Sequence, residues 1–199
     1  MEQNFYILRK DYDKNYARAI YEKNYTKRHI CELCGGIRVE ILSNLKISFK
    51  GKKEADYYSI PQHSIINEKM YNVLKEANIT GFDVADINVV GCYDNRGNEI
   101  KFNTNGLKEM IVKGRCGYLR NIDGTLIDKC EKCGRHDYSK EYRVNGLSVN
   151  LDEWDRSDIF CFENLRGLPI VTEKVKNILE KAKIKNITFQ NIKEFKFVD

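Results

Sequence analysis

Residues 65–87 read IINEKMYNVLKEANITGFDVADI, and they align without a gap with residues 170–192, IVTEKVKNILEKAKIKNITFQNI. Asn67 and Thr172 stand at the same place in the two segments, and either side chain can accept a hydrogen bond from the first N–H groups of a helix. Glu68 and Glu173 follow, where a negative charge suits the positive end of a helix. The two segments therefore predict the same capped helix twice.

Apolar residues recur at i, i+3, i+4 and i+7 in both segments, which is the spacing of one helix face. The pattern predicts that each helix buries this face on a sheet. The residues concerned are Met70, Val73, Leu74 and Ala77 in the first segment and Val175, Ile178, Leu179 and Ala182 in the second.

The flanks of the two predicted helices correspond as well. Gly81 and Asn186 follow the helices, and both residue types tolerate a positive φ, so we expect the same turn at both places. Alternating strand patterns come after the turns at 82–84 and 187–189, and strand-like stretches precede the helices at 56–60 and 158–162. We expect an α+β fold with two related strand–helix–strand repeats whose helices cover one face of a sheet.

The remaining segments complete this scheme. Residues 5–8 predict an opening strand, and residues 88–129 predict a central β-meander with turns at 94–98 and 122–125. The chain then divides into an N-terminal half, residues 1–107, and a C-terminal half, residues 108–199. Each half holds one copy of the repeat.

The seven cysteines include two matching units, Cys31–Cys34 and Cys130–Cys133, each of the form Cys-x-x-Cys-Gly. The glycine supplies a positive φ, and the resulting turn points two thiolates at one focus while backbone N–H groups reach the sulfurs. One unit supplies two of the four ligands of a tetrahedral site, and two units complete the all-cysteine site of a structural zinc. We expect Zn²⁺ to join two parts of the chain that lie 95 residues apart, in a zinc-ribbon-like site.

Other interpretations of these residues are open. A Cys-x-x-Cys pair can be a redox centre, and both units can be turns without a metal. His29 and His136 flank the units and could replace a ligand, although four cysteines suffice and we expect both histidines at the surface. Cys92, Cys116 and Cys161 lie in apolar or glycine-rich contexts, and we expect them to be small buried side chains, their roles otherwise open.

Composition limits the class of protein. The 199 residues carry a net charge of +5 and are 42% hydrophobic and 32% charged, which excludes a disordered tail and a fibrous repeat. No run approaches the roughly 20 apolar residues of a membrane span, and no secretory signal opens the chain, so we expect a cytoplasmic protein without membrane contact. The positive charges are scattered, so nucleic acid is not the expected partner. Four tyrosines among basic residues at 9–28 could form a binding surface or, more simply, cover a sheet edge: Tyr12, Tyr16, Tyr21 and Tyr25.

No catalytic motif is found. His63 has no nucleophile in a matching arrangement. Four carboxylates flank Trp154, and a solvated loop explains them better than an acidic active site: Asp152, Glu153, Asp155 and Asp158. We therefore expect a protein that is not an enzyme.

The order of these features resembles the double-CXXCG-motif family of bacterial proteins. The features are the strand at 5–8, CELCG at 31–35, CEKCG at 130–134, and the segment 158–192. Glu32 and Glu131 stand where many members have proline. Members of that family occur as immunity proteins in polymorphic toxin systems, so the resemblance implies a zinc-stabilised protein that binds and neutralises one cognate toxin. The alternative is a zinc-ribbon module that binds nucleic acid or regulates another protein.

Overall fold

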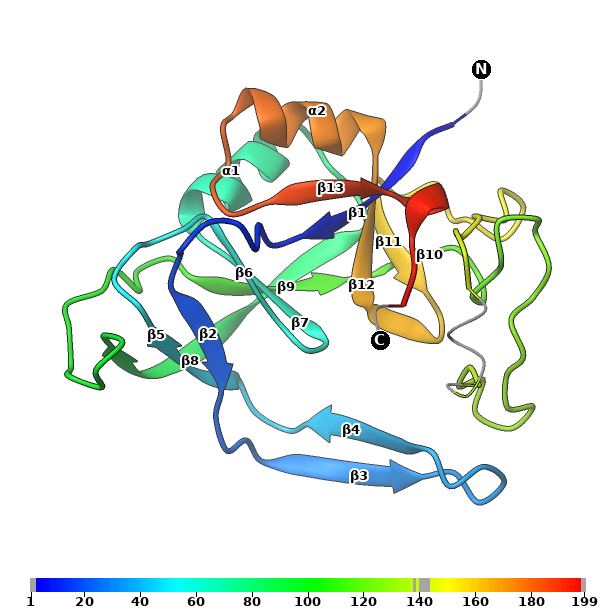
Figure 1. Ribbon diagram of the computed structural model, residues 1–199, viewed down its shortest axis with the longest axis horizontal. Helices are drawn as coiled ribbons and strands as arrows, with labels where there is room; N and C mark the ends of the chain where they lie inside the picture. The colour runs from blue at the N-terminus through cyan, green and yellow to red at the C-terminus, as the bar shows by residue number, and fades with distance from the viewer. Residues whose placement is uncertain (1–2, 138, 140–143, 198–199) are drawn as a thin grey trace.

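The fold is known from a computed structural model that describes residues 3–137, 139 and 144–197 (Figure 1). Within these residues the protein is α+β, with two α-helices, a short 3-10 helix and thirteen strands. The helices are α1 (Glu68–Glu76) and α2 (Glu173–Lys181), and the 3-10 helix is η2 (Ile192–Glu194). The strands are β1 (Phe5–Arg9), β2 (Arg18–Tyr21), β3 (Thr26–Ile30), β4 (Ile37–Ile41), β5 (Leu45–Lys50), β6 (Tyr57–Ile60), β7 (His63–Ile66), β8 (Phe82–Tyr93), β9 (Lys108–Val112), β10 (Gly114–Arg115), β11 (Ile159–Phe162), β12 (Leu165–Thr172) and β13 (Thr188–Asn191).

The strands form two large sheets and one separate hairpin. The first sheet has the order β10-β11-β12-β1-β13, and the second has the order β2-β5-β8-β9-β7-β6. Strands β3 and β4 pair only with each other and form a third layer at the lower edge of Figure 1. The expectation of one sheet beneath both helices was therefore wrong, because the two strand–helix–strand segments feed different sheets.

Both helices lie where the apolar spacing predicted them. Met70 and Leu74 on α1, and Val175 and Leu179 on α2, are buried in one core that the two helices share. The first cap is also confirmed, since the Asn67 side chain accepts a hydrogen bond from the Met70 N–H at 3.0 Å.

The expected cap on α2 is absent. Thr172 makes no side-chain bond to the helix, and its Oγ1 is buried without a partner among the described residues. The backbone of Thr172 has the extended conformation of an N-cap all the same, with φ −70° and ψ 162°. Thr172 is also the last residue of β12 and pairs with Phe5, and the first turn of α2 has no side-chain cap.

Each helix connects two parallel strands that are separated by one antiparallel strand. In the second sheet α1 links β7 and β8, and β9 lies between them antiparallel to both. In the first sheet α2 links β12 and β13, and β1 lies between them in the same way. Each sheet thus consists of strands from one half of the chain and one central strand from the other half.

The central strands keep the same register in the two sheets. Ile7 on β1 lies opposite positions 170 and 190, and Glu109 on β9 lies opposite positions 65 and 85. Positions 65 and 170 are aligned residues in the two sequence segments, and so are positions 85 and 190. The agreement on both sides of the strand makes β1 and β9 equivalent.

Contacts between the two halves are reciprocal. The Asp56 carboxylate accepts hydrogen bonds from Lys69 Nζ at 3.2 Å and from the backbone N–H of position 185 at 2.7 Å. The Asp158 carboxylate accepts the equivalent bonds from Lys174 Nζ at 3.1 Å and from the backbone N–H of position 80 at 3.0 Å. Such i-to-j and j-to-i contacts are the kind that a twofold axis produces, and the two strand–helix–strand segments make them at equivalent positions.

The turns after the helices agree with the prediction. Gly81 has a φ of +87° and Asn186 a φ of +67°, so both adopt the left-handed conformation. At Gly81 a Cβ would come within 2.0 Å of the Ile159 carbonyl oxygen, which explains why only glycine fits there. Asn186 is buried and donates its side-chain N–H to the Tyr57 carbonyl at 2.7 Å.

The predicted central meander does not form as a unit. Strand β8 extends to Tyr93, β9 inserts into the second sheet, and β10 joins the first. Tyr118 and Leu119 lie in no strand, and only isolated bridges such as Arg120–Leu126 follow. Local turn signals could not show that neighbouring strands go to different sheets. Among the described residues, no helix is long and apolar enough to cross a membrane.

Candidate metal centre

The two Cys-x-x-Cys-Gly units form the same turn. In the first knuckle (residues 31–36) the Cys31 N–H donates to the Gly36 carbonyl at 2.9 Å, and the Gly35 N–H donates to the Cys31 carbonyl at 2.8 Å. The second knuckle (residues 130–135) has both bonds at the equivalent positions, each 2.8 Å long. The glycine after the second cysteine has a positive φ in both, +65° and +74°. The turn chemistry predicted from the sequence is confirmed.

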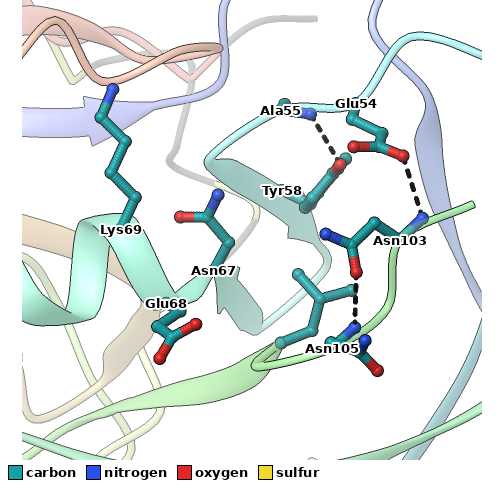
Figure 2. A pocket seen from close by; sticks show the side chains of 9 residues that line it. Glu54, Ala55, Tyr58, Asn67, Glu68, Lys69, Asn103 and Asn105 are labelled. Carbon is teal, nitrogen blue, oxygen red and sulfur yellow. Dashed lines mark hydrogen bonds between the residues drawn. The ribbon is translucent and has the colours of Figure 1, made fainter.

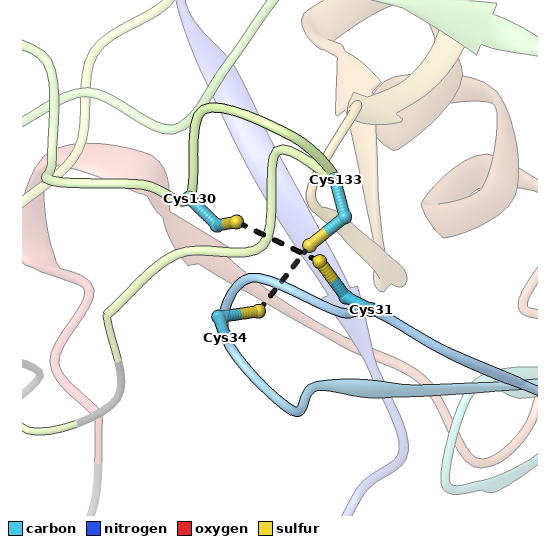
Figure 3. A group of neighbouring side chains, drawn as sticks. All are labelled: Cys31, Cys34, Cys130 and Cys133. Carbon is cyan, nitrogen blue, oxygen red and sulfur yellow. Dashed lines mark hydrogen bonds between the residues drawn. The ribbon is translucent and has the colours of Figure 1, made fainter.

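The knuckles bring four sulfur atoms together (Figure 3). The sulfurs of Cys31 and Cys130 lie 3.9 Å apart, and those of Cys34 and Cys133 lie 3.6 Å apart. All four lie within 4.8 Å of one another. A tetrahedron of sulfurs at a Zn–S bond length of about 2.3 Å has edges of about 3.8 Å. The four side chains lie close enough to hold a metal ion.

Each close sulfur pair joins residues at equivalent places in the two knuckles. Cys31 and Cys130 are 99 positions apart, as are Cys34 and Cys133. A contact between equivalent residues occurs on a twofold axis. The two knuckles therefore meet at equivalent residues.

The knuckle backbone favours the thiolate at two of the four positions. The backbone N–H groups of Cys34 and Leu33 lower the pKa of Cys31 to about 6. The N–H groups of Cys133 and Lys132 lower the pKa of Cys130 in the same way. Thiolates are the form of cysteine that binds metal, so the knuckle backbone prepares Cys31 and Cys130 as ligands.

Neighbouring sulfurs have the opposite effect on Cys34. The N–H of Gly36 lowers its pKa, but the Cys133 sulfur, burial, and the Cys130 and Cys31 sulfurs outweigh that bond and raise the pKa to about 11. Crowded thiolates repel one another, and a bound dication removes that repulsion. The proximity of the sulfurs therefore favours a metal over four free thiols.

Side chains around the sulfurs tie the knuckles to each other. Glu32 in the first knuckle forms an ion pair with Lys132 in the second. A Cβ at Gly36 would lie 2.8 Å from Cδ of Arg135 and 3.1 Å from the Cys34 sulfur. The second glycine of CELCGG thus leaves room for the Arg135 side chain of the second knuckle.

The two flanking histidines stand outside the cluster. His29 bonds Glu40 across the β3–β4 hairpin at 2.9 Å and is exposed, as expected. The expectation for His136 was wrong: it is buried, its Nδ1 lies 3.3 Å from the Asn164 carbonyl, and its ring stacks on Phe197. Its position next to a charged knuckle gave no sign that this part of the chain packs on the core.

The other predicted positions have structural surroundings. Cys92, Cys116 and Cys161 are buried, as expected. Trp154 is buried against Phe5 and Phe160. Three of the four carboxylates around it are bonded to different groups: Glu153 to Arg120, Asp155 to the backbone N–H groups of Arg115 and Ser157, and Asp158 to Lys174 and Thr80.

One close pair of titratable side chains could not be predicted from the sequence. His63 on β7 bonds Glu109 on β9 at 2.6 Å, and Tyr21 stacks on the histidine ring. The pair joins residues 46 positions apart, and nothing in the sequence places β9 beside β7. Its position in the sheet ladder makes it a contact between the two halves.

A small polar hollow lies beside the start of α1 (Figure 2). Its volume is about 190 Å³, below the roughly 300 Å³ at which small-molecule sites begin. Several of its polar groups are already bonded, with the Ala55 N–H donating to Tyr58 Oη at 2.7 Å and the Asn103 N–H donating to Glu54 at 2.9 Å. This hollow offers little to a ligand.

Comparison with known proteins adds no relative. No protein-family model matches the chain, and no curated protein is similar to it in sequence.

Proposed function

We propose that the protein is an immunity protein of the double-CXXCG kind, which acts in the cytoplasm by binding and neutralising one cognate bacterial toxin. The observation that carries the proposal is the meeting of two separate CxxCG knuckles in one sulfur cluster. The order of the other motifs along the chain agrees with that family.

The proposed cofactor is one structural zinc ion. Cys31, Cys34, Cys130 and Cys133 would hold it, and four thiolates are the ligand set of closed structural zinc sites. The ion would supply folding energy by joining the halves of the chain, and it leaves no open position for chemistry. Zinc fits the all-sulfur set better than magnesium or calcium, which prefer oxygen ligands.

The two strand–helix–strand segments are, in this proposal, copies of one ancestral unit joined in a zinc-ribbon-like arrangement. The matching turns, registers and Asp–Lys contacts support a duplication. Two unrelated amphipathic helices would share the apolar spacing but would have no reason to share these contacts. The meeting of the knuckles at equivalent residues then descends from a symmetric pair of units.

Net charge limits how a toxin would be blocked. An inhibitor that imitates nucleic acid to block a nuclease carries an acidic surface, whereas this chain has a net charge of +5. We therefore expect the protein to cover an acidic or neutral surface of the toxin. Tyrosine and arginine side chains are the usual anchors of such contacts.

The test is a binding measurement with the purified toxin domain encoded next to this gene. We expect sub-micromolar binding by calorimetry, and survival of cells that produce the toxin domain together with this protein. The matched control is an unrelated toxin domain of similar size and charge. No binding to the neighbouring toxin at micromolar concentration, together with cell death on co-production, would refute the proposal.

The second candidate is a zinc-ribbon module that binds nucleic acid. Lys27, Arg28 and Arg38 lie on the hairpin beside the first knuckle, and none of them forms an ion pair with a described residue. Duplex binding at 50 mM salt that is lost by 200 mM would favour this function. Binding of the toxin domain without duplex binding would exclude it.

A further inference from the structure

Exposed apolar side chains concentrate around the β3–β4 hairpin. Fourteen large hydrophobic side chains are exposed among the described residues, and eight of them lie within residues 20–42. They are Ile20, Tyr21, Tyr25, Ile30, Leu33, Ile37, Val39 and Leu42. Single exposed apolar residues need no explanation, but a contiguous group is typical of an interaction site.

The hairpin has one apolar face and one charged face. Opposite residues in an antiparallel pair lie on the same face, and the register pairs Ile30 with Ile37 and Arg28 with Val39. Ile30 is 66% exposed, Ile37 54% and Val39 45%. The next face-sharing residue, Ile41, packs against the core of the second sheet. The apolar face thus continues outward from the core into solvent.

The equivalence of the two knuckles supplies an internal comparison. The second knuckle is flanked by the bridge Lys129–His136, at the positions equivalent to Ile30 and Ile37. Ile127 and His136 beside that knuckle are buried in or against the core. The equivalent residues beside the first knuckle, Arg28 and Ile37, are exposed. The residues beside the second knuckle thus pack on the core, whereas the first knuckle is flanked by an exposed apolar face.

Charge on the hairpin indicates the partner's chemistry. The two strands carry three cations and one carboxylate, Glu40. The hydrogen bond with His29 lowers the pKa of Glu40, and the Glu40 carboxylate is therefore already occupied by this histidine. The three cations form no ion pair with any described residue. Such a surface favours a partner with carboxylates around an apolar patch.

We propose that the face of the β3–β4 hairpin formed by Arg28, Ile30, Ile37 and Val39 is the docking surface for the toxin. The toxin surface that fits it has an apolar centre and an acidic margin. This inference rests on the proposed function, because the toxin is its occupant. Ile30, Ile37 and Val39 supply the buried centre of the contact, and Lys27, Arg28 and Arg38 guide the encounter.

The test compares two valines with nearly equal exposure. Val39 on β4 is 45% exposed, and Val90 on β8 is 48% exposed outside the hairpin. Both are changed to aspartate in the full chain, and the dissociation constant is measured with the purified neighbouring toxin domain. We expect Val39→Asp to weaken binding at least tenfold and Val90→Asp to leave it within twofold. Arg28→Glu should slow association at low salt.

Zinc content and denaturant unfolding of each variant show whether the knuckle and the fold are retained. If the wild type binds and folded Val39→Asp binds equally well, the docking surface is refuted while the proposed function stands. If the wild type does not bind the toxin, both fail together. Vesicles with 30% anionic lipid and a 20-base-pair duplex are tested alongside. Binding to either that is sensitive to Val39→Asp, without toxin binding, would assign the face to a membrane or a nucleic acid and refute the inference.

Discussion

Cys130 contributes one sulfur to a cluster in which no other described group stands ready to replace it. His136, six positions later, bonds Asn164 rather than pointing into the cluster. A serine at position 130 would remove a thiolate ligand and leave three. Since structural zinc sites contribute folding energy directly, the loss should appear in the stability of the whole protein.

We therefore predict that Cys130→Ser abolishes stoichiometric zinc and lowers the free energy of unfolding by at least roughly 3 kcal/mol. Elemental analysis gives the metal content, and urea unfolding gives the stability. Cys92→Ala is the control, because Cys92 is a thiol outside the cluster. A Cys130→Ser protein with one zinc per chain and unchanged stability would contradict a structural Cys₄ site.

Tyr58 should make the free energy of unfolding fall at alkaline pH. Its ring packs on Phe49 with centroids 4.8 Å apart, and its hydroxyl oxygen accepts the Ala55 N–H at 2.7 Å. Burial raises the pKa of Tyr58 to about 12, from 10.0. A pKa raised by folding means that the neutral side chain stabilises the fold fully below pH 10. That stabilisation is lost as the pH rises from 10 through 12.

The expected loss in this pH window is on the order of 2 kcal/mol. Between pH 9 and pH 11 roughly 1.3 kcal/mol of this loss should appear, because the titration is only half complete at pH 11, and urea unfolding at the two pH values measures that part. Tyr58→Phe should reduce the difference between the two pH values, whereas Tyr12→Phe should not, because Tyr12 is 74% exposed. Burial also raises the pKa of Tyr57, so part of the alkaline loss should persist in Tyr58→Phe. Equal losses in all three proteins would show that Tyr58 is not responsible.

At the scale of the elements, the two helices differ chiefly in their first turns. Asn67 caps α1 and also donates its side-chain N–H to Asp56 at 2.9 Å. Thr172 occupies the equivalent place on α2 beside Asp158. The Asn67 backbone N–H donates to the Asp56 carbonyl, and the Thr172 backbone N–H donates to the Asp158 carbonyl, each at 3.0 Å. The surroundings of an asparagine cap are therefore already present at position 172.

We predict that Thr172→Asn raises the free energy of unfolding by roughly 0.5–1 kcal/mol, the usual value of an N-cap. The reciprocal change, Asn67→Thr, should lower it by a similar amount. Urea unfolding of the two single variants and the double variant measures both effects. Because the sites are distant along the chain but share one core, the double variant also shows whether the effects add. A destabilised Thr172→Asn protein would show that the equivalence of the two caps fails.

The elements themselves could be read from the sequence where local chemistry decides them. The helices follow from apolar spacing, the turn at Gly81 from its lack of a Cβ, and the knuckles from Cys-x-x-Cys-Gly. The sequence pattern also identified the four clustered cysteines. Strands β1 and β6 fell at the expected residues for the same reason.

Sheet membership could not be predicted in that way. A strand pattern specifies which face is apolar but not which neighbour it pairs with. Strand β9 belongs to the meander by sequence proximity, yet it lies between β7 and β8, and β1 lies between strands more than 150 residues away. The burial of His136 was missed for the same reason, since its core neighbours come from distant segments.

For the whole molecule, the exchange of central strands makes the halves depend on each other. Removing residues 1–97 would take β1 from the middle of the first sheet, and removing the rest would take β9 from the second. The helices also share one core, to which both sheets contribute. The sulfur cluster is thus one of several connections between the halves.

A cut between the halves tests this arrangement in the full chain. The turn at 94–98 is exposed, and a Cβ at Gly97 would meet nothing within 4 Å, so a protease recognition sequence can be inserted after Gly97. We predict that the cleaved protein elutes from a sizing column as one species with the volume of the uncleaved protein, and that it unfolds in one transition. Removing zinc with a chelator should lower the unfolding midpoint without separating the fragments, because β1 and β9 remain paired on both edges. Uncleaved protein with the same insertion is the control. Separation on cleavage alone would disprove the interlocked strands, and separation only after chelation would show that the metal, rather than strand exchange, holds the halves together.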